Sequence, residues 1–144
     1  MDRVDRAILD QLARDASVAN VELAARVNLS PSACLRRVRA LERAGVIRGY
    51  RAEIDPAALG RGFEVEVMIE LTRKDRATVE TIEERIAAMD EVVSCRRLFG
   101  VPDYLMRVAV KDAEAYEAFY MAKLAELPGI GRVTSQFTMK LVKG

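Results

Sequence analysis

Residues 20–44 read NVELAARVNLSPSACLRRVRALERA, and this stretch decides the fold of the N-terminal third of the chain. Asn20 can cap a short helix, because its side-chain carbonyl can accept a hydrogen bond from a free backbone N–H. Asn28 tolerates the left-handed backbone that a tight turn needs. Ser30 and Pro31 can start a second helix, since serine is a good N-cap and proline has no N–H to lose there. Two helices joined by about three residues predict a helix-turn-helix.

The second helix of this motif has an apolar side and an opposite side that is small and basic. At about 100° per residue, the inward stripe is predicted to contain Pro31, Cys34, Leu35, Val38 and Leu41. The outward side contains Ser32, Ala33, Arg36, Ala40 and Arg43, with Arg37 and Arg39 on the flanks. An arginine-rich helix exposed to solvent is the alternative, but the turn, the proline restart and the one-sided arginines together favour DNA.

Small residues let such a helix lie deep in the major groove, and arginine can bond guanine edges or neutralise phosphates. We therefore expect two sets of contacts to double-stranded DNA. The residues expected at base edges are Ser32, Ala33, Arg36 and Arg37. The residues expected at phosphates are Ser30, Arg39, Arg43 and Arg48.

A further helix is predicted over residues 2–14, where Val4, Ile8 and Leu12 recur every four residues and Asp2 can cap. Three helices with short connections predict a winged-helix-like domain at 1–45. Gly45 suits the position just after the last helix.

Residues 46–60 form the predicted linker. The segment 46–54 alternates in polarity like a strand and can be a wing, a hinge or a strand that pairs two subunits. The residues after it, Asp55-Pro56-Ala57-Ala58-Leu59, predict one helical turn opened by a cap and a proline.

The remaining segment, 61–144, has the pattern of a ferredoxin-like βαββαβ domain, which makes the whole chain α+β. Strands are predicted at 63–71, 92–99, 104–110 and 130–142, and helices are predicted to start after Asp75 and Asp112. The last strand is predicted to turn one face inward, with Val133, Ser135, Phe137, Met139 and Leu141.

In this fold both helices cover one face of the sheet. The other face is expected to show Glu64, Glu66, Met68, Val92, Arg96, Leu98, Leu105 and Ala109. So many uncovered apolar side chains indicate a partner, most simply a second copy of the chain.

The composition is that of a globular protein, with 144 residues, 51% of them hydrophobic and 31% charged. No apolar run approaches the roughly 20 residues that span a bilayer, and the N-terminus lacks the apolar core of a signal peptide. We expect a cytoplasmic protein without membrane contact. The net charge of +1 divides into +4 for residues 1–51 and −3 for residues 52–144, which supports an anionic partner for the N-terminal part.

No metal or cofactor is expected. The chain has no histidine, and its two cysteines, Cys34 and Cys95, are too far apart for a metal-binding spacing. No nucleophile–base motif and no phosphate-binding glycine loop is present, so we expect no enzymatic activity.

The whole chain resembles the Lrp/AsnC (feast/famine) family of transcription regulators. The resemblance is carried by DRVDRAILDQL at 2–12, NVELAARVNLSPSACLRRVRALERAGVIRGY at 20–50, GVPDYLMRV at 100–108 and LPGIGRV at 127–133. It implies a DNA-binding N-terminal domain and a C-terminal regulator-of-amino-acid-metabolism domain that binds an amino acid or another small metabolite. It also implies homodimers that assemble into tetramers or octamers.

By position, the resemblance implies an effector site where subunits meet, formed by Gly100, Asp103, Tyr104, Thr134, Gln136 and Thr138. A carboxylate can pair with an α-ammonium group, and amide or hydroxyl groups can hold a carboxylate. The alternative is that 100–103 is an ordinary hairpin turn and that the other three residues form an exposed strand face.

Two other functions stay open at this point. One is a metabolite-binding or oligomerisation module without DNA binding, and the other is a decarboxylase similar to some haem-pathway enzymes, which rely on a histidine that this chain lacks. Many family members also carry a basic arm before the first helix. This sequence starts at its first helix, so we expect the helix after Pro31 to supply most of the DNA specificity.

Overall fold

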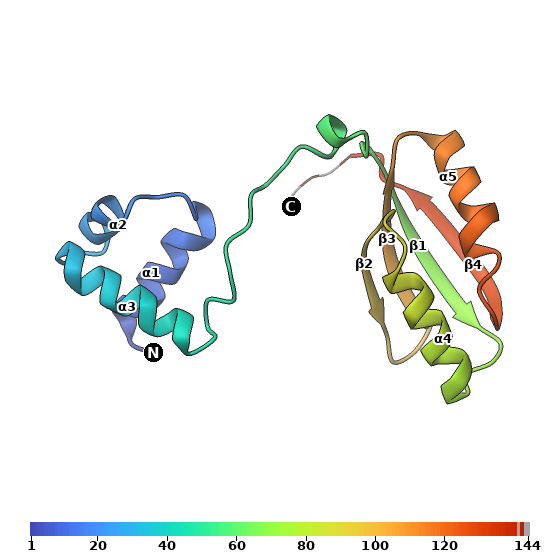
Figure 1. Cartoon of the computed structure of the whole chain (residues 1–144), viewed down its shortest axis with the longest axis horizontal. Coiled ribbons are helices and arrows are strands. Elements are labelled where there is room, and N and C mark those ends of the chain that lie inside the picture. Colours follow the sequence, from blue (N-terminus) through green and yellow to red (C-terminus); the bar gives the residue numbers. More distant parts are fainter. Residues whose placement is uncertain (141, 143–144) are drawn as a thin grey trace. The chain divides into compact units, whose positions relative to one another are not determined.

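The computed structural model describes residues 1–140 and 142 (Figure 1). These residues divide into two compact units, one that ends at Glu53 and one that begins at Ile54. The predicted domain limits at 45 and 60 lie on either side of this division. Each unit is described by itself below.

Three helices form the N-terminal unit: α1 (Arg3–Arg14), α2 (Asn20–Arg26) and α3 (Pro31–Arg43). Each of them contributes a fully enclosed side chain to one small core, since Ile8, Ala24 and Cys34 are all 0% exposed. The complete set of buried residues is Ile8, Leu23, Ala24, Val27, Cys34, Val38 and Leu41. Helices of 7 to 13 residues are marginal alone, so this shared core holds them together.

Two of the predicted helix starts are confirmed by their caps. Asp2 accepts the Asp5 N–H at 2.8 Å, and the Asp5 carboxylate accepts the Asp2 N–H at 2.9 Å, which is a capping box. Ser30 accepts the Ala33 N–H at 3.3 Å, with Pro31 at the first helical position. Both caps satisfy N–H groups that have no partner inside the helix.

The predicted cap of the second helix is wrong. Helix α2 begins at Asn20 itself, and no side chain caps it. The Asn20 side-chain amide instead donates to the Pro31 carbonyl at 2.8 Å. Folding of α3 brings that carbonyl within reach, a contact between residues eleven positions apart that no local pattern reveals.

The turn between α2 and α3 has the predicted left-handed residue. Asn28 has φ 56°, and it is the one residue other than glycine with positive φ in the described chain. Gly45, just past α3, has φ 68° and ends that helix as predicted. Both positions turn the chain where a β-branched side chain would be strained.

The strand expected at 46–54 is absent from the described part of this single chain. A strand is stable only when its N–H and C=O groups pair with a neighbour, and here no second strand lies beside the segment. The predicted helical turn after it is confirmed as a short 3₁₀ helix, η1 (Pro56–Leu59), capped by the Asp55 side chain on the Ala57 N–H.

The C-terminal unit is the predicted βαββαβ fold. Its strands are β1 (Phe63–Leu71), β2 (Val92–Arg97), β3 (Tyr104–Val110) and β4 (Ile130–Phe137). Its helices are α4 (Arg76–Ala87) and α5 (Ala113–Phe119), which continues as one π-helical turn, η2 (Tyr120–Leu124). The sheet is antiparallel with the order β2-β3-β1-β4, so β1 and β3 are its central strands.

Both helices cover the same face of this sheet (Figure 1). From β1 the inward side chains are Val65, Val67, Ile69 and Leu71, and from β3 they are Tyr104, Met106, Val108 and Val110. Helix residues that meet them include Ile82, Ile86, Tyr116, Phe119 and Leu124. Burial alternates along β1 from Glu64 to Leu71 and along β3 as far as Val108, which confirms the period-two pattern there. Ala109, expected on the uncovered face, is also buried, at 3% exposure.

Three further details of the sheet differ from the prediction. Strand β2 ends at Arg97, so Leu98 and Phe99, predicted in this strand, lie in the loop before β3. Val92 was expected on the uncovered face, but it packs against the helix-covered core because a register shift between Val92 and Ser94 reverses its side. Strand β4 ends at Phe137 instead of continuing to residue 142, although the Thr138 N–H still donates to the Glu64 carbonyl. Leu141, predicted in this strand, lies outside the described residues.

In the part of the chain that the structure describes, every helix is too short or too polar to cross a membrane.

We predict that the backbone at Asn28 controls the stability of the N-terminal unit. Asn28→Val should lower its free energy of unfolding by about 1–2 kcal/mol, because a β-branched residue is strained at positive φ. Asn28→Gly, the matched control, should be as stable as the parent or more so. Urea denaturation followed by circular dichroism measures both, and equal stability of the two variants would contradict the prediction.

Candidate nucleic-acid interface and ligand-binding surfaces

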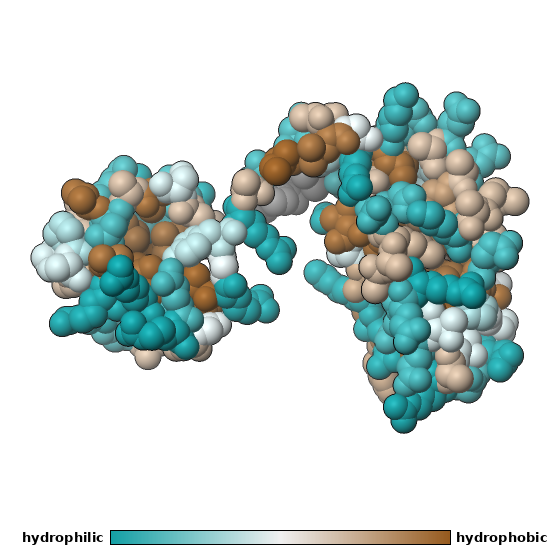
Figure 2. All heavy atoms as spheres, in the orientation of Figure 1, coloured by the Kyte–Doolittle hydropathy of each residue, from teal (hydrophilic) through white to brown (hydrophobic). Residues whose placement is uncertain are grey.

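Helix α3 has one buried face and one exposed face. Cys34, Val38 and Leu41 point into the core and are at most 9% exposed. On the opposite side, Ser32, Arg36, Arg39, Ala40 and Arg43 are exposed, and Ala33 is half-buried at the edge. Figure 2 shows strongly hydrophilic side chains gathered over α3. This arrangement can present a small N-terminal end and three guanidinium groups to the DNA major groove.

Arg37 is placed differently from the other arginines of α3. Its Nη1 atom lies 2.7 Å from an Asp2 carboxylate oxygen and 2.8 Å from an Asp5 oxygen, both on or next to α1. The pKa values of both carboxyls are lowered, first by the backbone N–H bonds of the capping box and then by Arg37. Arg37 therefore joins α3 to the start of α1.

Sequence reasoning misplaced two side chains of α3, because Pro31 at its first position is exposed and so is Leu35. Leu35 was expected in the apolar stripe, yet it is 39% exposed and lies beside the basic face. It is one residue, or about 100°, from Cys34, which is the centre of the buried face, so the core reaches only part of it. An exposed apolar group at this place can contact a thymine methyl.

The start of α3 is positioned by two contacts that the sequence did not suggest. The Asn20 amide bonds the Pro31 carbonyl, as described above, and the hydroxyls of Ser30 and Ser32 lie 3.3 Å apart. The first contact ties the start of α3 to the start of α2. The start of α3 is therefore bonded to α2, and Cys34, Val38 and Leu41 hold the helix in the core.

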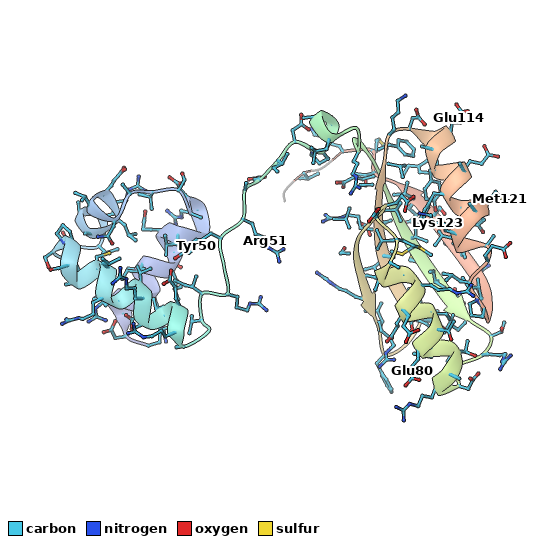
Figure 3. The ribbon with its side chains drawn as sticks, in the orientation of Figure 1. Tyr50, Arg51, Glu80, Glu114, Met121 and Lys123 are labelled. Carbon is cyan, nitrogen blue, oxygen red and sulfur yellow. The ribbon has the colours of Figure 1, made fainter. Side chains whose placement is uncertain are left out.

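Arg48, the last residue expected at phosphates, is exposed in the segment after α3. In the same segment the Tyr50 hydroxyl donates to Glu42 at 2.8 Å, so Tyr50 turns toward the helices and Arg51 turns away (Figure 3). A shallow groove of about 670 Å³ runs between α1 and this segment, lined by Leu9, Leu12, Ala13, Ala16 and residues 46–51.

Asp103 is engaged inside its own chain. Its carboxylate accepts the Leu71 N–H at 2.8 Å and pairs with Lys74 at 2.7 Å. The Leu71 N–H, followed by Lys74, lowers the pKa of this carboxyl. The side chain thus anchors the loop before β3 to the end of β1, rather than projecting into open space.

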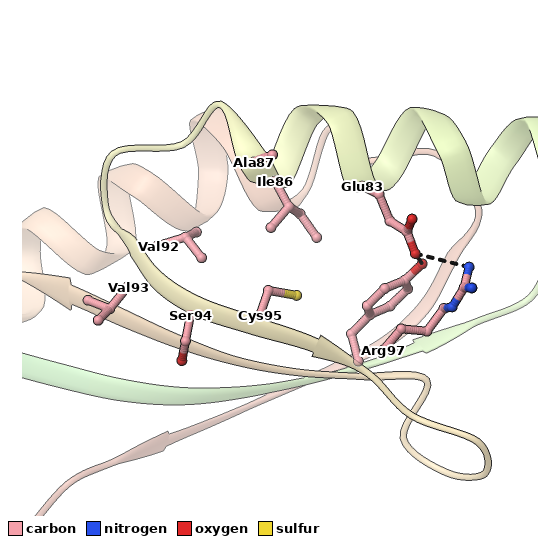
Figure 4. Close-up of a pocket in the computed structure, with 9 residues that line it drawn as sticks. Glu83, Ile86, Ala87, Val92, Val93, Ser94, Cys95 and Arg97 are labelled. Atoms are coloured by element: carbon pink, nitrogen blue, oxygen red, sulfur yellow. Dashed lines mark hydrogen bonds and ion pairs between the residues drawn. The ribbon is translucent and has the colours of Figure 1, made fainter. Parts of the chain in front are cut away.

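Tyr104 is almost fully buried, at 1% exposure, and points toward α4. Its hydroxyl donates to Glu83 at 3.1 Å, and Arg97 pairs with the same carboxylate at 3.0 Å (Figure 4). Burial, followed by the Glu83 carboxylate, raises the pKa of Tyr104 to about 12. These groups line a hollow of about 350 Å³ between α4 and β2 that also exposes Cys95.

The other three residues implied at the effector site lie on the uncovered face of the sheet or just beyond its edge strand. In the register of the sheet, Thr134 pairs with Met68 and Gln136 with Glu66, while the Thr138 N–H bonds the Glu64 carbonyl. Asp103 instead lies beside Leu71, at the other end of β1.

Within one chain the separation differs from residue to residue. Thr134 is level with Met68, three positions from Leu71, whereas Thr138 is level with Glu64. Seven residues separate Glu64 from Leu71, and at about 3.3 Å per residue this is about 23 Å along the strand. A free amino acid cannot touch both ends. Gly100, with φ 137° and open space around it, lies in the hairpin loop at the Asp103 end. Within one chain, therefore, Thr138 cannot share one amino acid with Asp103, whereas Thr134 is about 10 Å along the strand from that end.

Two family models match the chain. A winged helix-turn-helix DNA-binding model matches residues 1–48, and an Lrp/AsnC ligand binding domain model matches residues 64–144. The leucine-responsive regulatory protein of Escherichia coli K12 is 38% identical over 143 residues, which cover 99% of this chain and 87% of that protein.

Solved structures of similar regulators cover the whole chain. A transcriptional regulator from Neisseria meningitidis, in complex with L-Met, is 34% identical with a TM-score of 0.94 and covers 100% of this chain and 93% of its own. An AsnC family transcriptional regulator from Agrobacterium tumefaciens is 38% identical with a TM-score of 0.92, and the coverage is 100% and 94%. These similar proteins are transcriptional regulators, not enzymes.

The position of Asp103 generates a prediction about pH. Its pKa is lower in the folded chain than in the unfolded chain, so its contribution to stability is present above about pH 4 and is lost as pH falls below that value. Asp103→Asn should be less stable than the parent at pH 7 and should lose less stability between about pH 4 and pH 2.

Thermal unfolding of the parent and the variant across this pH range measures the difference. Asp90→Asn, at an exposed carboxylate of the same unit, controls for the loss of one charge. Parallel curves for the parent and Asp103→Asn would contradict the prediction.

Proposed function

The chain belongs to the Lrp/AsnC family of DNA-binding transcriptional regulators, and on that premise we propose which residues contact DNA and what kind of molecule regulates it. The exposed basic face of α3 contacts the major groove of double-stranded DNA, and the C-terminal unit binds an amino acid or a related small metabolite. The observation that carries the first part is the one-sided burial of α3, which turns three arginines outward. The similar proteins named above are bacterial transcriptional regulators, and we place this protein in the cytoplasm by analogy with them.

We assign the contacts of α3 by exposure. Ser32, Ala33 and Arg36 lie toward base edges, with Leu35 beside them as an apolar contact. The residues assigned to phosphates are Ser30, Arg39, Arg43 and Arg48. Arg37, expected at base edges from the sequence, is assigned instead to holding α3 against α1, because two carboxylates already occupy its guanidinium.

Arg36→Ala should lower affinity for the best DNA site by about 1–3 kcal/mol and relax base preference at one position, because a guanidinium that reads a base edge is lost. A fluorescence anisotropy titration on a selected site and its single-base variants measures this. Arg14→Ala removes the same charge from the exposed end of α1 and should leave base preference unchanged.

Arg37→Ala provides the second comparison. It should lower the thermal unfolding midpoint of the N-terminal unit, since Asp2 and Asp5 lose their shared partner, and it should change base preference less than Arg36→Ala does. An Arg36→Ala protein that binds every site as the parent does would count against this placement of α3.

The proposed effector is an amino acid held where copies of the chain meet. Support comes from the ligand-binding family model and from a similar regulator that was solved with L-Met. Asp103 lies at the Leu71 end of β1 and Thr138 at the Glu64 end. Tyr104 turns to the helix-covered face, while Thr134 and Gln136 turn to the open face. A site that uses all of these residues would therefore draw them from more than one copy. In this arrangement Asp103 and Tyr104 shape the loop, while the exposed hydroxyl and amide groups of β4 are free to bond the ligand.

At least one of the twenty common amino acids should raise the thermal unfolding midpoint and change DNA affinity. A ligand at about 100 times its Kd stabilises the folded state by about 2.7 kcal/mol, which is easily detected in a thermal-shift screen. Thr134→Val should reduce the shift. A screen without any stabilising amino acid would exclude this class of effector.

We also propose that the basic assembly is a homodimer joined through the uncovered face of the sheet, with tetramers or octamers built from dimers. Met68 and Leu105 are apolar and only half-buried on this face. A second copy is the simplest partner for such a surface, because a two-fold axis makes one patch complementary to itself.

A further inference from the structure

The uncovered face of the sheet carries its charges in rows. The register of the strands places Glu64, Glu66 and Glu70 of β1 on this face. The neighbouring strands place arginines there, namely Arg107 of β3, Arg96 of β2 and Arg132 of β4. An acidic row on one central strand therefore lies beside a basic position on the other central strand.

Arg107 is the member of this pattern whose bonding is incomplete. Its Nε atom is buried, and within the described residues it has no hydrogen-bond partner. Buried polar atoms are nearly always bonded, because leaving one unpaired costs the free energy of its lost hydration. Glu66 is the direct cross-strand neighbour of Arg107, yet it does not satisfy this atom.

A hollow of about 240 Å³ surrounds Arg107. It is lined by Glu66, Ser94, Arg96, Leu105 and Arg107, so two guanidinium groups face one carboxylate. The hollow therefore has room and surplus positive charge for a second carboxylate. The surplus of negative charge lies on β1, where three glutamates share the same face.

Two-fold symmetry decides which strands face each other when two such sheets stack. A two-fold axis that lies between the sheets and runs across the strands would place β1 of one copy on β1 of the partner. The two rows of glutamates would then repel each other. An axis parallel to the strands, between β1 and β3, places β1 of each copy over β3 of the other. Only the second arrangement brings opposite charges together, and such complementarity sets register and orientation.

We propose that the open face pairs with a second copy along an axis parallel to the central strands, with Glu66 of each copy bonded to Arg107 of the other. The two reciprocal ion pairs fill the two hollows and supply the missing acceptor for Arg107. This rests on the dimer proposed above and adds its orientation and the residues that determine it. A stacked pair of sheets with other partners for Arg107 is the competing arrangement.

Charge reversal and mixing test the pair in the full-length protein. Glu66→Arg alone places arginine against arginine at both sites, and Arg107→Glu alone places glutamate against glutamate. Each variant should dimerise at least tenfold more weakly than the parent. An equimolar mixture should form heterodimers with nearly parental affinity, since every contact between copies then joins opposite charges.

Mixing distinguishes contacts between copies from contacts within one chain. If Glu66 and Arg107 mattered only to each other within the same chain, each variant would retain its like-charge neighbours and mixing would restore nothing. Sedimentation velocity gives the dimer affinities, and two differently labelled variants report heterodimers by energy transfer. Circular dichroism confirms that each variant is folded.

Milder and matched variants complete the test. Glu66→Gln and Arg107→Gln remove one charge without creating repulsion and should weaken the dimer by a smaller factor than the reversals. Glu117→Arg, on the exposed side of α5, reverses a charge on the helix-covered side of the unit and should leave dimerisation unchanged.

The possible failures have different meanings. A parent protein that is monomeric would overturn both the dimer and this pairing. A dimeric parent with single variants that associate normally, or with folded variants that mixing does not restore, would overturn the Glu66–Arg107 pairing alone.

Discussion

Burial of Cys34, Val38 and Leu41 against the other two helices sets what α3 can offer to a partner. Once this face is enclosed, helical geometry turns Ser32 and Arg36 outward and places Arg37 beside α1. Two adjacent arginines thereby acquire different tasks. Arg36 is left exposed, where we propose that it contacts DNA, and Arg37 is bonded to Asp2 and Asp5 within the domain.

The same one-sided burial governs the C-terminal unit. Helices α4 and α5 cover the face of the sheet that carries Val67, Ile69 and Met106 and leave the opposite face open. The open face is not simply apolar. Its glutamates and arginines occupy separate strands, which limits the ways in which a second copy could stack on it. In our proposal DNA contact and self-association belong to separate units. Each unit buries one side of its elements and presents the other.

Loop anchoring explains why the residues implied at the effector site do not form a pocket within one chain. Asp103 is bonded to Leu71 and Lys74, and Tyr104 is buried against Glu83. Thr134 lies on the opposite, uncovered face of the sheet, and Thr138 follows β4 at the Glu64 end of β1. The proposed site, if it uses both groups, takes residues from several copies, and ligand binding would then depend on assembly.

The sequence by itself determined the order of the helices and strands, the turn at Asn28, the caps at Asp2 and Ser30, and the face of β1 that is buried. These features follow from local backbone preferences and from the periods of helix and strand, so they can be predicted from short segments of the sequence. The tertiary structure alone decided the roles of Asn20, Arg37 and Asp103, the side on which Val92 lies and the missing strand after α3. Each of these depends on a partner distant in sequence or on a neighbouring strand, and no local pattern encodes which groups folding brings together.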